Sequence, residues 1–371
     1  CMRVGYDITA IDERPSGVGT YARTLLGALA ASDAGHAFVP LSNRPGAATR
    51  SFPSRMLWMQ CVLPGELRRL GLDLCHYTNS IGPLGHPGSY VVTIHDMTLS
   101  LMPRYHPFRK QLLIRPVVAL TARRASRIIT VSEHARRDIM RLLRVPPERV
   151  CVTSEAADPI FRPVDHDEQQ RVRAAHGIRG PYLLFVGTIE PRKNLARLIS
   201  AWARLRADRV IPHQLVLVGG RGWHDQPIFE QVARCGFGDQ VIFTGYVPRA
   251  DLPGLYTGAD AFVLPSLAEG FGLPLIEALA CGTPAVISAT PALTEVAGGA
   301  ALLVDPKSIG SIAVGLERIV CDPQLRCMLH EQGLRRAAEF SWQRTASLTL
   351  GVYQEALNAS TPGRSRNLYS T

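Results

Sequence analysis

The 371-residue sequence predicts an α/β protein built from two doubly wound domains. Three observations lead to this prediction. Short apolar runs, typical of buried strands, alternate with helical patterns along the chain. This alternation starts twice, once near residue 2 and once near residue 181. A chain of this length also favours two domains over one. Strands that alternate with helices form a parallel sheet covered on both faces.

The first domain is expected to start with a buried strand over 2–8, "MRVGYDI", followed by a loop and a helix over 20–30. A further strand is expected over 90–96, "YVVTIHD". The segment 127–143 predicts a strand followed by a helix. Ser132 is suited to cap that helix, because its hydroxyl can accept a hydrogen bond from a free N–H of the first turn.

The second domain repeats this plan with the strand "PYLLFVG" over 181–187, the loop "TIEPRKN" and a helix over 195–205. Three more apolar runs are expected to be strands, at 213–220, 241–247 and 261–266.

The domain boundary is placed in the stretch 155–170, which is rich in Pro and Asp. The predicted domains are therefore 1–163 and 164–341. A last helix is expected at about 342–357, and the polar segment 358–371 is expected to be a flexible tail.

Composition limits the classes of partner and compartment. The formal net charge of +10 favours acidic partners such as nucleic acid, anionic lipid or phosphorylated small molecules, although scattered solvated charges would give the same total. None of the eight cysteines forms a C-x-x-C pair, which indicates free thiols in a reducing compartment. With no signal peptide pattern and no uninterrupted apolar span, we expect a cytoplasmic protein.

The segment 101–127 is basic and apolar in patches, so it could lie on an anionic membrane surface at the inner face of the membrane. The alternative is a surface helix whose apolar side packs on the first domain. We favour the alternative, because Pro103, Pro107 and Pro116 should break up a long membrane-lying helix.

Ligands of doubly wound sheets bind at the carboxyl ends of the strands, so two such domains would present their loops across one cleft. Gly17 and Gly19 lie between a strand and a helix of the first domain. Glycines there allow a close approach of the backbone to an anion at the helix N-terminus. A loop that simply needs positive φ would also contain them.

Arg192 and Lys193 follow a predicted strand of the second domain. Two cations at that place suit a diphosphate, because Arg can bind oxygens bidentately and Lys is a compact charge. A solvated basic turn is the alternative.

His95 ends a strand of apolar residues, where it is either a structural histidine or a ligand-facing one. Adjacent strand residues point to opposite faces, so Asp96 should not orient it directly. The Asp-His-Asp run at 165–167 resembles a metal site but precedes a helix, so capping explains it better. No obligatory metal is expected.

Glu269 and Glu277 lie on either side of a glycine-rich turn. Gly270 and Gly272 disfavour a helix before Pro274, which suits a first helical turn. The two acids should therefore flank the free N–H groups of a helix end, an arrangement that can hold an anion. Helix-dipole stabilisation alone would also explain Glu277.

Several segments, in order, resemble retaining glycosyltransferases of family 4, which have the GT-B fold of two Rossmann-like domains. "EGFGLPLIEALACGTPAV" resembles the Glu-x7-Glu signature of that family. "SGVGTYARTLL", "TIHDMTLS" and "VSEHARRDI" resemble segments of its first domain, and "VGTIEPRKNLARLI" and "FTGYVPRADLPGLYTGADAFVLPS" resemble segments of its second. The resemblance covers nearly the whole chain, and it implies that the final helix crosses back to the first domain.

The resemblance also implies residue roles. Glu269 would contact hydroxyls of the donor sugar and Glu277 the nucleotide ribose, while Arg192 and Lys193 would stabilise the diphosphate. His95 would face the sugar near its anomeric centre. The donor would further be bound by the backbone of a glycine-rich set in both domains: Gly17, Gly19, Gly270, Phe271, Gly272 and Leu273.

The implied activity is metal-independent transfer of a hexose from a nucleotide sugar to a glycan or lipid-linked acceptor, with retention of configuration and no nucleic acid partner. The motifs look most like bacterial mannosyltransferases of surface polysaccharide, so GDP-mannose is the first expected donor and a UDP-sugar the alternative. A sugar-nucleotide epimerase, a phosphorylase-like enzyme and a nucleotide-sugar sensor are the competing classes. One departure is Thr188, which follows Gly187 where many members carry Arg.

Overall fold

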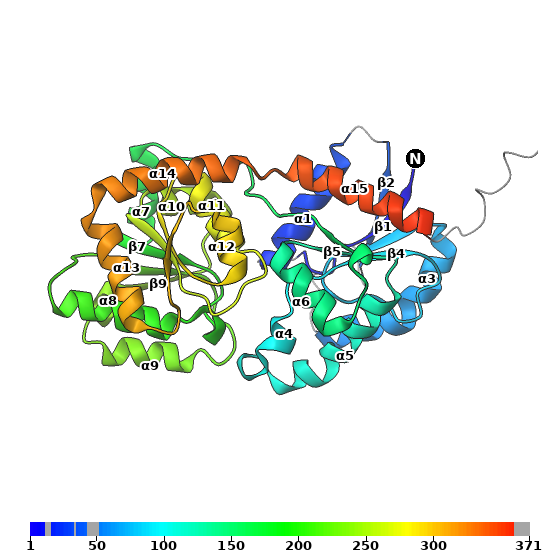
Figure 1. The fold of residues 1–371 in the computed structure, drawn as a ribbon, viewed down its shortest axis with the longest axis horizontal. Helices are drawn as coiled ribbons and strands as arrows, with labels where there is room; N and C mark the ends of the chain where they lie inside the picture. Colours follow the sequence, from blue (N-terminus) through cyan, green and yellow to red (C-terminus); the bar gives the residue numbers. More distant parts are fainter. Residues whose placement is uncertain (12–15, 33–34, 43–51, 360–371) are drawn as a thin grey trace, which may run out of the picture. The chain divides into compact units, whose positions relative to one another are not determined.

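The computed structural model describes residues 1–11, 16–32, 35–42 and 52–359. The chain forms two compact units, each with one six-stranded parallel sheet (Figure 1). The first unit comprises Cys1–Leu101, Phe108–Glu155 and the chain from Trp342 onward. The second comprises Met102–Pro107 and Ala156–Ser341. The predicted α/β class with two doubly wound domains is confirmed.

The first sheet has the strand order β2-β1-β3-β4-β5-β6. Its order reverses between β1 and β3, which is where a doubly wound sheet binds its ligand at the carboxyl ends of the strands. The strands are β1 (Arg3–Asp7), β2 (Ala37–Leu41), β3 (Leu74–Tyr77), β4 (Tyr90–Thr93), β5 (Arg127–Thr130) and β6 (Val150–Val152).

Helices surround this sheet, and the C-terminal helix α15 belongs to this unit, where it lies beside α1 (Figure 1). The helices are α1 (Gly17–Ala30), α2 (Phe52–Leu57), a π-helical turn (Trp58–Val62), α3 (Leu63–Leu70), α4 (Thr98–Leu101), α5 (Phe108–Arg124), α6 (Glu133–Leu143), a 3₁₀ turn (Pro147–Arg149) and α15 (Trp342–Ala359).

The second sheet has the order β12-β11-β10-β7-β8-β9, so its direction of growth reverses between β7 and β10. Every residue of β7, β8 and β10 is buried, as expected for parallel strands covered on both faces. The strands are β7 (Tyr182–Val186), β8 (Gln214–Val218), β9 (Val241–Gly245), β10 (Ala261–Leu264), β11 (Ala285–Ser288) and β12 (Leu302–Val304).

The second unit also contains eight α-helices and several 3₁₀ turns in its described part. The helices are α7 (His166–Ala175), α8 (Leu195–Ala207), α9 (Gln226–Arg234), α10 (Leu252–Thr257), α11 (Leu273–Ala280), α12 (Pro291–Ala297), α13 (Ile309–Cys321) and α14 (Pro323–Ala338). The 3₁₀ turns are Pro191–Lys193, Gly238–Gln240 and Arg249–Asp251, and a further turn over Pro103–Tyr105 is grouped with this unit.

Two helix predictions are corrected. α1 starts at Gly17 and not at Thr20, because the Ser16 hydroxyl accepts a hydrogen bond from the Gly19 N–H and caps the helix there. α5 runs unbroken through Pro116, so the prediction that Pro116 interrupts this segment is wrong. Packing of Val118 against the core of the unit offsets the hydrogen bond that the proline removes.

The two sides of α5 differ. Val118 and Ala122 are buried in the core, as the favoured alternative predicted. Phe108, Leu112 and Leu113 instead face solvent, with 74%, 63% and 59% of their surface exposed. In the described part of the chain, every helix is too short or too polar to span a lipid bilayer.

A buried polar chain joins α15 to the first sheet. The ring of His76 lies between the Tyr353 hydroxyl and the Thr93 hydroxyl, each 2.7 Å from a ring nitrogen. Burial lowers the pKa of His76 to about 3, so the ring is neutral and can donate from one nitrogen while it accepts at the other. The Thr93 hydroxyl also lies 3.1 Å from that of Tyr21 on α1.

Candidate functional site

Two loops of the second unit meet where the order of its sheet reverses. One follows β7 and contains the 3₁₀ turn Pro191–Lys193, and the other follows β10 and contains Glu269. The Leu267 N–H donates to the Arg192 carbonyl at 2.9 Å, which ties the two loops together. The parallel pairing of β7 with β10 therefore positions residues that are far apart in sequence at one place.

Glu269 is held between two cations at this place. Lys193 Nζ donates to Glu269 Oε1 at 2.6 Å, and an Arg192 nitrogen donates to Glu269 Oε2 at 3.0 Å. All three side chains are largely buried, with exposures of 9% for Lys193, 14% for Arg192 and 8% for Glu269. The structure thus brings together three of the predicted site residues.

Arg192 has further acceptors in the protein. Its guanidinium donates to Glu190 Oε1 at 2.7 Å and to the Ala268 carbonyl at 2.7 Å. Glu190 is buried, so the guanidinium is fixed between two carboxylates and a carbonyl. In this arrangement Arg192 orients Glu269. Lys193 Nζ, which donates to one acceptor among the described residues, retains further N–H groups for a ligand.

The conformation of the first loop is fixed by Asn194. Its backbone is left-handed, with φ of 62°, a conformation that Asn tolerates better than most residues. Its side-chain amide donates to the carbonyls of Pro265 and Pro306, at 3.0 and 2.7 Å. These bonds hold the turn that carries Lys193 against the ends of the neighbouring strands.

The electrostatics of the cluster favour an ionised Glu269. Burial is the largest single effect and would raise the pKa of this carboxyl. The charges of Lys193 and Arg192, together with their hydrogen bonds, outweigh burial and lower the pKa to about 2. Glu269 is therefore a carboxylate at neutral pH, and it can accept hydrogen bonds from ligand hydroxyls.

The glycine-rich turn after Glu269 leads directly into α11. Gly272 has φ of 98°, and a Cβ there would lie 2.7 Å from a methyl carbon of Leu293, so only glycine fits. Helix α11 begins at Leu273, one residue before the predicted start at Pro274. Phe271 is buried and packs edge-on against Phe340, at 5.7 Å between ring centroids. Gly270 is buried in the same turn.

Glu277 lies just past the first turn of α11 and is buried, with 9% exposure. The hydroxyl of Tyr256 on α10 donates to Glu277 Oε2 at 2.9 Å. Burial and the neighbouring Glu277 charge raise the pKa of Tyr256 well above its usual value, so the hydroxyl keeps its proton and remains a donor. The sequence interpretation did not anticipate this partner.

In the first unit, His95 follows β4, and both of its ring nitrogens have oxygen partners. Nδ1 lies 3.2 Å from Glu155 Oε1, and Nε2 lies 3.0 Å from the Thr78 carbonyl, to which it donates. Burial lowers the pKa of His95, but the hydrogen bond and charge of Glu155 raise it further, so the net shift is upward. Because both nitrogens are engaged, the ring is not available as a general base.

As expected, Asp96 does not orient His95, because its Oδ1 has other partners. Asp96 Oδ1 accepts from the N–H and the hydroxyl of Thr98, at 2.8 and 2.6 Å, at the start of α4. The acid that orients His95 is Glu155, which follows β6.

The two glycines near the start of α1 have different surroundings. A Cβ on Gly19 would lie 2.4 Å from the carbonyl oxygen of Ala10, so this residue is glycine because the helix approaches that backbone closely. Gly17 is exposed and has open space around it. Residues 12–15 of the preceding loop lie outside the described residues.

The Asp-His-Asp run acts as a helix start. Asp165 Oδ1 accepts from the Glu168 N–H at 2.9 Å, which makes it the N-cap of α7. Across the described residues, no three His, Cys, Asp or Glu side chains gather in a way that could hold a metal ion.

Sequence reasoning missed Glu190, Tyr256 and Glu155, which support Arg192, Glu277 and His95. A signal for two of them was present. Glu155 lies shortly after β6 (Val150–Val152), at the edge of the first sheet where ligand-facing residues gather, and Glu190 precedes the basic pair in "TIEPRKN". The sequence carries no comparable signal for Tyr256. Its contact with Glu277 arises only because the fold packs α10 beside α11.

Comparisons with known proteins agree with this geometry. Residues 15–161 match the model of Glycosyltransferase Family 4, and residues 167–336 match that of Glycosyl transferases group 1. The boundary between the two matches lies close to the division between the two units of the structure.

Individual relatives extend the match over much of the chain. The O-antigen chain mannosyltransferase B of Escherichia coli is 34% identical over 265 residues, which cover 71% of this chain and 70% of that protein. A solved sucrose-phosphate synthase from Thermosynechococcus elongatus has a TM-score of 0.77 at 22% identity, covering 97% of this chain and all of the other. The Anabaena protein HepE, solved with UDP and glucose, has a TM-score of 0.75 at 19% identity, covering 95% and 99%. The chain therefore belongs to glycosyltransferase family 4 and is a hexosyltransferase with the GT-B fold.

Proposed function

We propose that this protein transfers mannose from GDP-mannose to a glycan or lipid-linked acceptor, with retention of the anomeric configuration. The observation that carries the transferase chemistry is the buried cluster of Lys193, Glu269 and Arg192 where the order of the second sheet reverses. Mannose as the sugar is supported by the 34% identical relative, which is a mannosyltransferase.

Each residue of the cluster has a role that follows from its contacts. The nucleoside diphosphate is the leaving group, and negative charge develops on it as the glycosidic bond breaks. Lys193 is placed to stabilise that charge, and a preorganised cation in a buried site does so more effectively than in water. Glu269, ionised and held from two sides, accepts hydrogen bonds from sugar hydroxyls.

Further residues of each unit are assigned to donor binding. Glu277 binds the ribose hydroxyls, and the amides of Gly270, Phe271, Gly272 and Leu273 assist at the diphosphate. In the first unit, Gly17 and Gly19 contribute backbone at the start of α1. His95 contributes through its main chain, because both of its ring nitrogens are engaged.

We further propose that the reaction needs no metal ion, since Lys193 supplies positive charge where a metal would otherwise neutralise the diphosphate. Retention follows from front-face attack by the acceptor, with the departing diphosphate as proton acceptor. A UDP-sugar donor is the alternative, and the HepE structure with UDP supports it for this fold.

The decisive experiment is a thermal-shift panel of GDP-, UDP-, ADP- and dTDP-sugars on the full chain, because a ligand that binds the native state raises its Tm. We expect the largest shift with GDP-mannose. Release of GDP, unchanged by EDTA, and an α-linked product by NMR would support the transfer mechanism. Binding without release of nucleoside diphosphate would favour a sensor, and no shift with any sugar nucleotide would refute the donor site.

We also propose that the first unit contacts an anionic membrane through α5, whose Phe108, Leu112 and Leu113 are exposed. Sedimentation with vesicles containing anionic lipid tests this. Replacing both leucines by serine should reduce the bound fraction, whereas equal binding by the variant would refute the contact.

A further inference from the structure

A chain of hydrogen bonds connects the ends of four strands in the first sheet, and Glu155 is its last member. The Thr78 hydroxyl donates to the Asp7 carbonyl at 3.0 Å, which joins the segment after β3 to the end of β1. His95, which follows β4, donates from Nε2 to the Thr78 carbonyl at 3.0 Å. Its Nδ1 lies 3.2 Å from Oε1 of Glu155, which follows β6. The imidazole ring therefore joins the segments after β3, β4 and β6.

The central pair of this chain is shielded from water. The side chain of His95 is 14% exposed and that of Glu155 is 5% exposed. Tyr21 of α1 packs edge-on against the His95 ring, with 4.6 Å between the ring centroids. The Thr345 hydroxyl of α15 donates to the Ser154 carbonyl at 2.6 Å, which fixes the backbone beside Glu155. A hydrogen bond lost in such surroundings is costly, because water does not replace the missing partner.

The positions of the two partners determine where the ring protons lie. The Thr78 carbonyl can only accept, so Nε2 must carry a proton. A carboxyl group loses its proton at a lower pH than an imidazole does, so the proton between Glu155 and Nδ1 belongs to the ring. Either neutral form of His95 would place a nitrogen lone pair against an oxygen acceptor. Only the doubly protonated ring satisfies both contacts at once.

The charges around the ring agree with this form. Burial lowers the pKa of His95, but its contacts with Glu155 and the Thr78 carbonyl raise it above the ordinary value of 6.5. Three further titratable side chains lie around the ring: Asp96, His76 and Tyr21. The charge of Asp96 adds to the upward shift. Burial lowers the pKa of His76 to about 3 and raises that of Tyr21, so both are uncharged at neutral pH.

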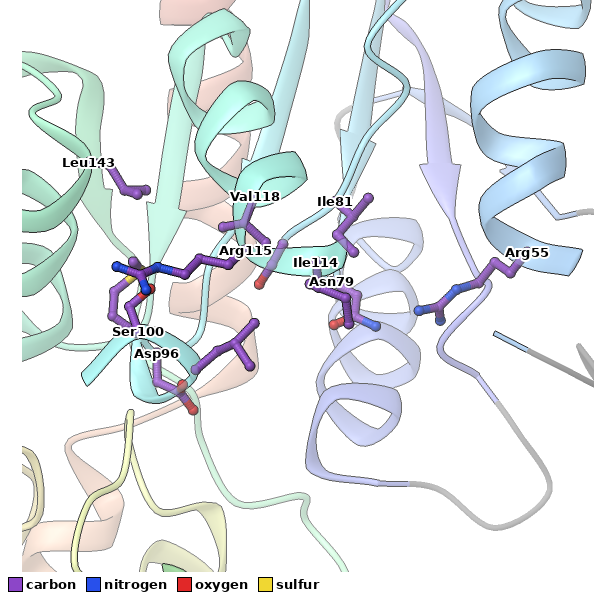
Figure 2. A pocket seen from close by; sticks show the side chains of 12 residues that line it. Arg55, Asn79, Ile81, Asp96, Ser100, Ile114, Arg115, Val118 and Leu143 are labelled. Atoms are coloured by element: carbon purple, nitrogen blue, oxygen red, sulfur yellow. The ribbon is translucent and has the colours of Figure 1, made fainter. Parts of the chain in front are cut away.

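The segments that the ring joins lead to positions that the proposed reaction uses. Asn79 and Asp96, the residues next to Thr78 and His95, line a cavity of about 250 Å³ (Figure 2). The main chain of His95 is itself assigned to donor binding. A ring released from either contact would let these segments shift against each other. Misplacement by about 1 Å can lower a rate about 10²-fold.

We propose that Glu155 is a positioning residue of the transfer reaction, which holds the doubly protonated His95 ring on Thr78 and so fixes the segments after β3 and β4. The inference rests on the proposed transferase function. Glu155 acts through His95 and not by contact with the donor. Turnover should then fall as the pH rises through the pKa of His95, because the neutral ring keeps only one of its two contacts.

The test measures kcat for GDP release at saturating donor, between about pH 5.5 and pH 9. In the wild type, kcat should fall as the pH rises above 6.5. Glu155→Gln should invert this profile, because glutamine can donate to Nδ1 of a neutral ring that still donates to Thr78. Its kcat should be maintained at pH 8 and fall at low pH. Glu155→Leu offers no partner to Nδ1 and should lower kcat by about 10²-fold at every pH.

Nitrogen-15 NMR of the labelled histidines gives a readout that does not depend on turnover. At pH 6.5 the two ring nitrogens of His95 should have similar shifts in the wild type, because the ring is charged, and different shifts in Glu155→Gln. Asp138→Asn is the matched control. Asp138 Oδ2 lies 3.4 Å from Nε2 of His134 on α6, so this variant removes a carboxylate from another histidine pair and should leave the pH profile of kcat unchanged.

Three outcomes would overturn the inference: a wild-type kcat that does not fall above pH 6.5, the same alkaline fall in Glu155→Gln, or a wild-type kcat per folded enzyme in Glu155→Leu. A role in stability alone would lower the Tm of the variants without inverting the pH profile. Failure of the transferase function is distinguishable. The wild type would then release no GDP at any pH, which overturns both proposals, whereas GDP release with parallel profiles for the wild type and Glu155→Gln overturns only the role of Glu155.

Discussion

Two basic sites lie at the carboxyl edges of two similar sheets, but their charges are balanced differently. In the second unit, Lys193 and Arg192 are buried against Glu269 and Glu190. In the first unit, Arg115 is exposed and has no partner among the described residues. A buried cation needs a matching anion, because its desolvation is costly, whereas an exposed one does not.

This difference separates two functions of positive charge. The paired cluster holds its cation in one geometry before any ligand arrives, which is what transition-state stabilisation requires. An exposed guanidinium stays hydrated and needs no such partner within the protein. Substitutions in the second unit should therefore change both stability and turnover, whereas substitution of the exposed Arg115 should leave the stability nearly unchanged.

The largest effect is expected for Glu269→Gln. Turnover should fall by about 10²–10³, by analogy with the loss of one preorganised polar group at a reacting centre. The variant should also lose about 3 kcal/mol of unfolding free energy, because Lys193 and Arg192 remain buried with one carboxylate fewer. Steady-state GDP release and urea denaturation measure the two effects.

The control is the double variant Lys193→Met with Glu269→Gln. It removes a cation together with the anion, so its unfolding free energy should lie closer to that of the wild type than the single variant does. Turnover should stay low. If the single and the double variant lose the same unfolding free energy, Lys193 and Glu269 are not energetically coupled, contrary to the short distance between them.

Acid sensitivity is the next effect. The pKa of Glu269 is lowered from 4.5 to about 2, so its ion pairs stabilise the protein above the unfolded pKa and that stability is lost as the pH falls from 4.5 towards 2. The difference corresponds to about 3 kcal/mol. Urea denaturation at pH 5 and pH 3 should show a steeper loss for the wild type than for the double variant, and parallel losses would contradict the assigned pKa.

Glu190→Gln should have a smaller effect. Arg192 would keep Glu269 and the Ala268 carbonyl as acceptors but lose one of its two carboxylates, so it would hold Glu269 less rigidly. We expect kcat to fall about tenfold with little change in KM for the donor, because a contact that improves only the transition state affects kcat. If Glu190 only supports the fold, Glu190→Gln should lower the unfolding free energy and leave kcat per folded enzyme unchanged.

The sequence predicted that Arg192, Lys193 and Glu269 lie at the same edge of a doubly wound sheet, because each follows a strand. It assigned Arg192 to a diphosphate and did not predict its contacts with Glu269, Glu190 and the Ala268 carbonyl, since these depend on how the turn at Asn194 is closed. The course of α5 through Pro116 was also missed, because tertiary packing outweighed a local rule.

The cavity of about 250 Å³ in the first unit, with Arg55, Asn79 and Arg115 in its lining, shows a second limit. Arg55 and Arg115 come from two helices, and Asn79 follows a strand that the sequence analysis did not identify. No spacing connects these residues, so only the fold brings them together. Glu155 could have been found from the sequence. Recognising β6 as a strand would have identified Glu155 as a candidate site residue, because it follows the carboxyl end of that strand.

The smallest effect is expected for Tyr256→Phe, which separates binding from catalysis in the second unit. The variant removes one hydrogen bond to Glu277 and should lose about 1 kcal/mol of unfolding free energy. If Glu277 binds the ribose, its contacts are the same in the ground state and the transition state, so KM for the donor should rise while kcat stays constant. Glu277→Gln should shift KM in the same direction and further. If both variants instead lower stability and leave KM unchanged, Glu277 only satisfies the buried Tyr256 hydroxyl, and the donor site is limited to the cluster around Glu269.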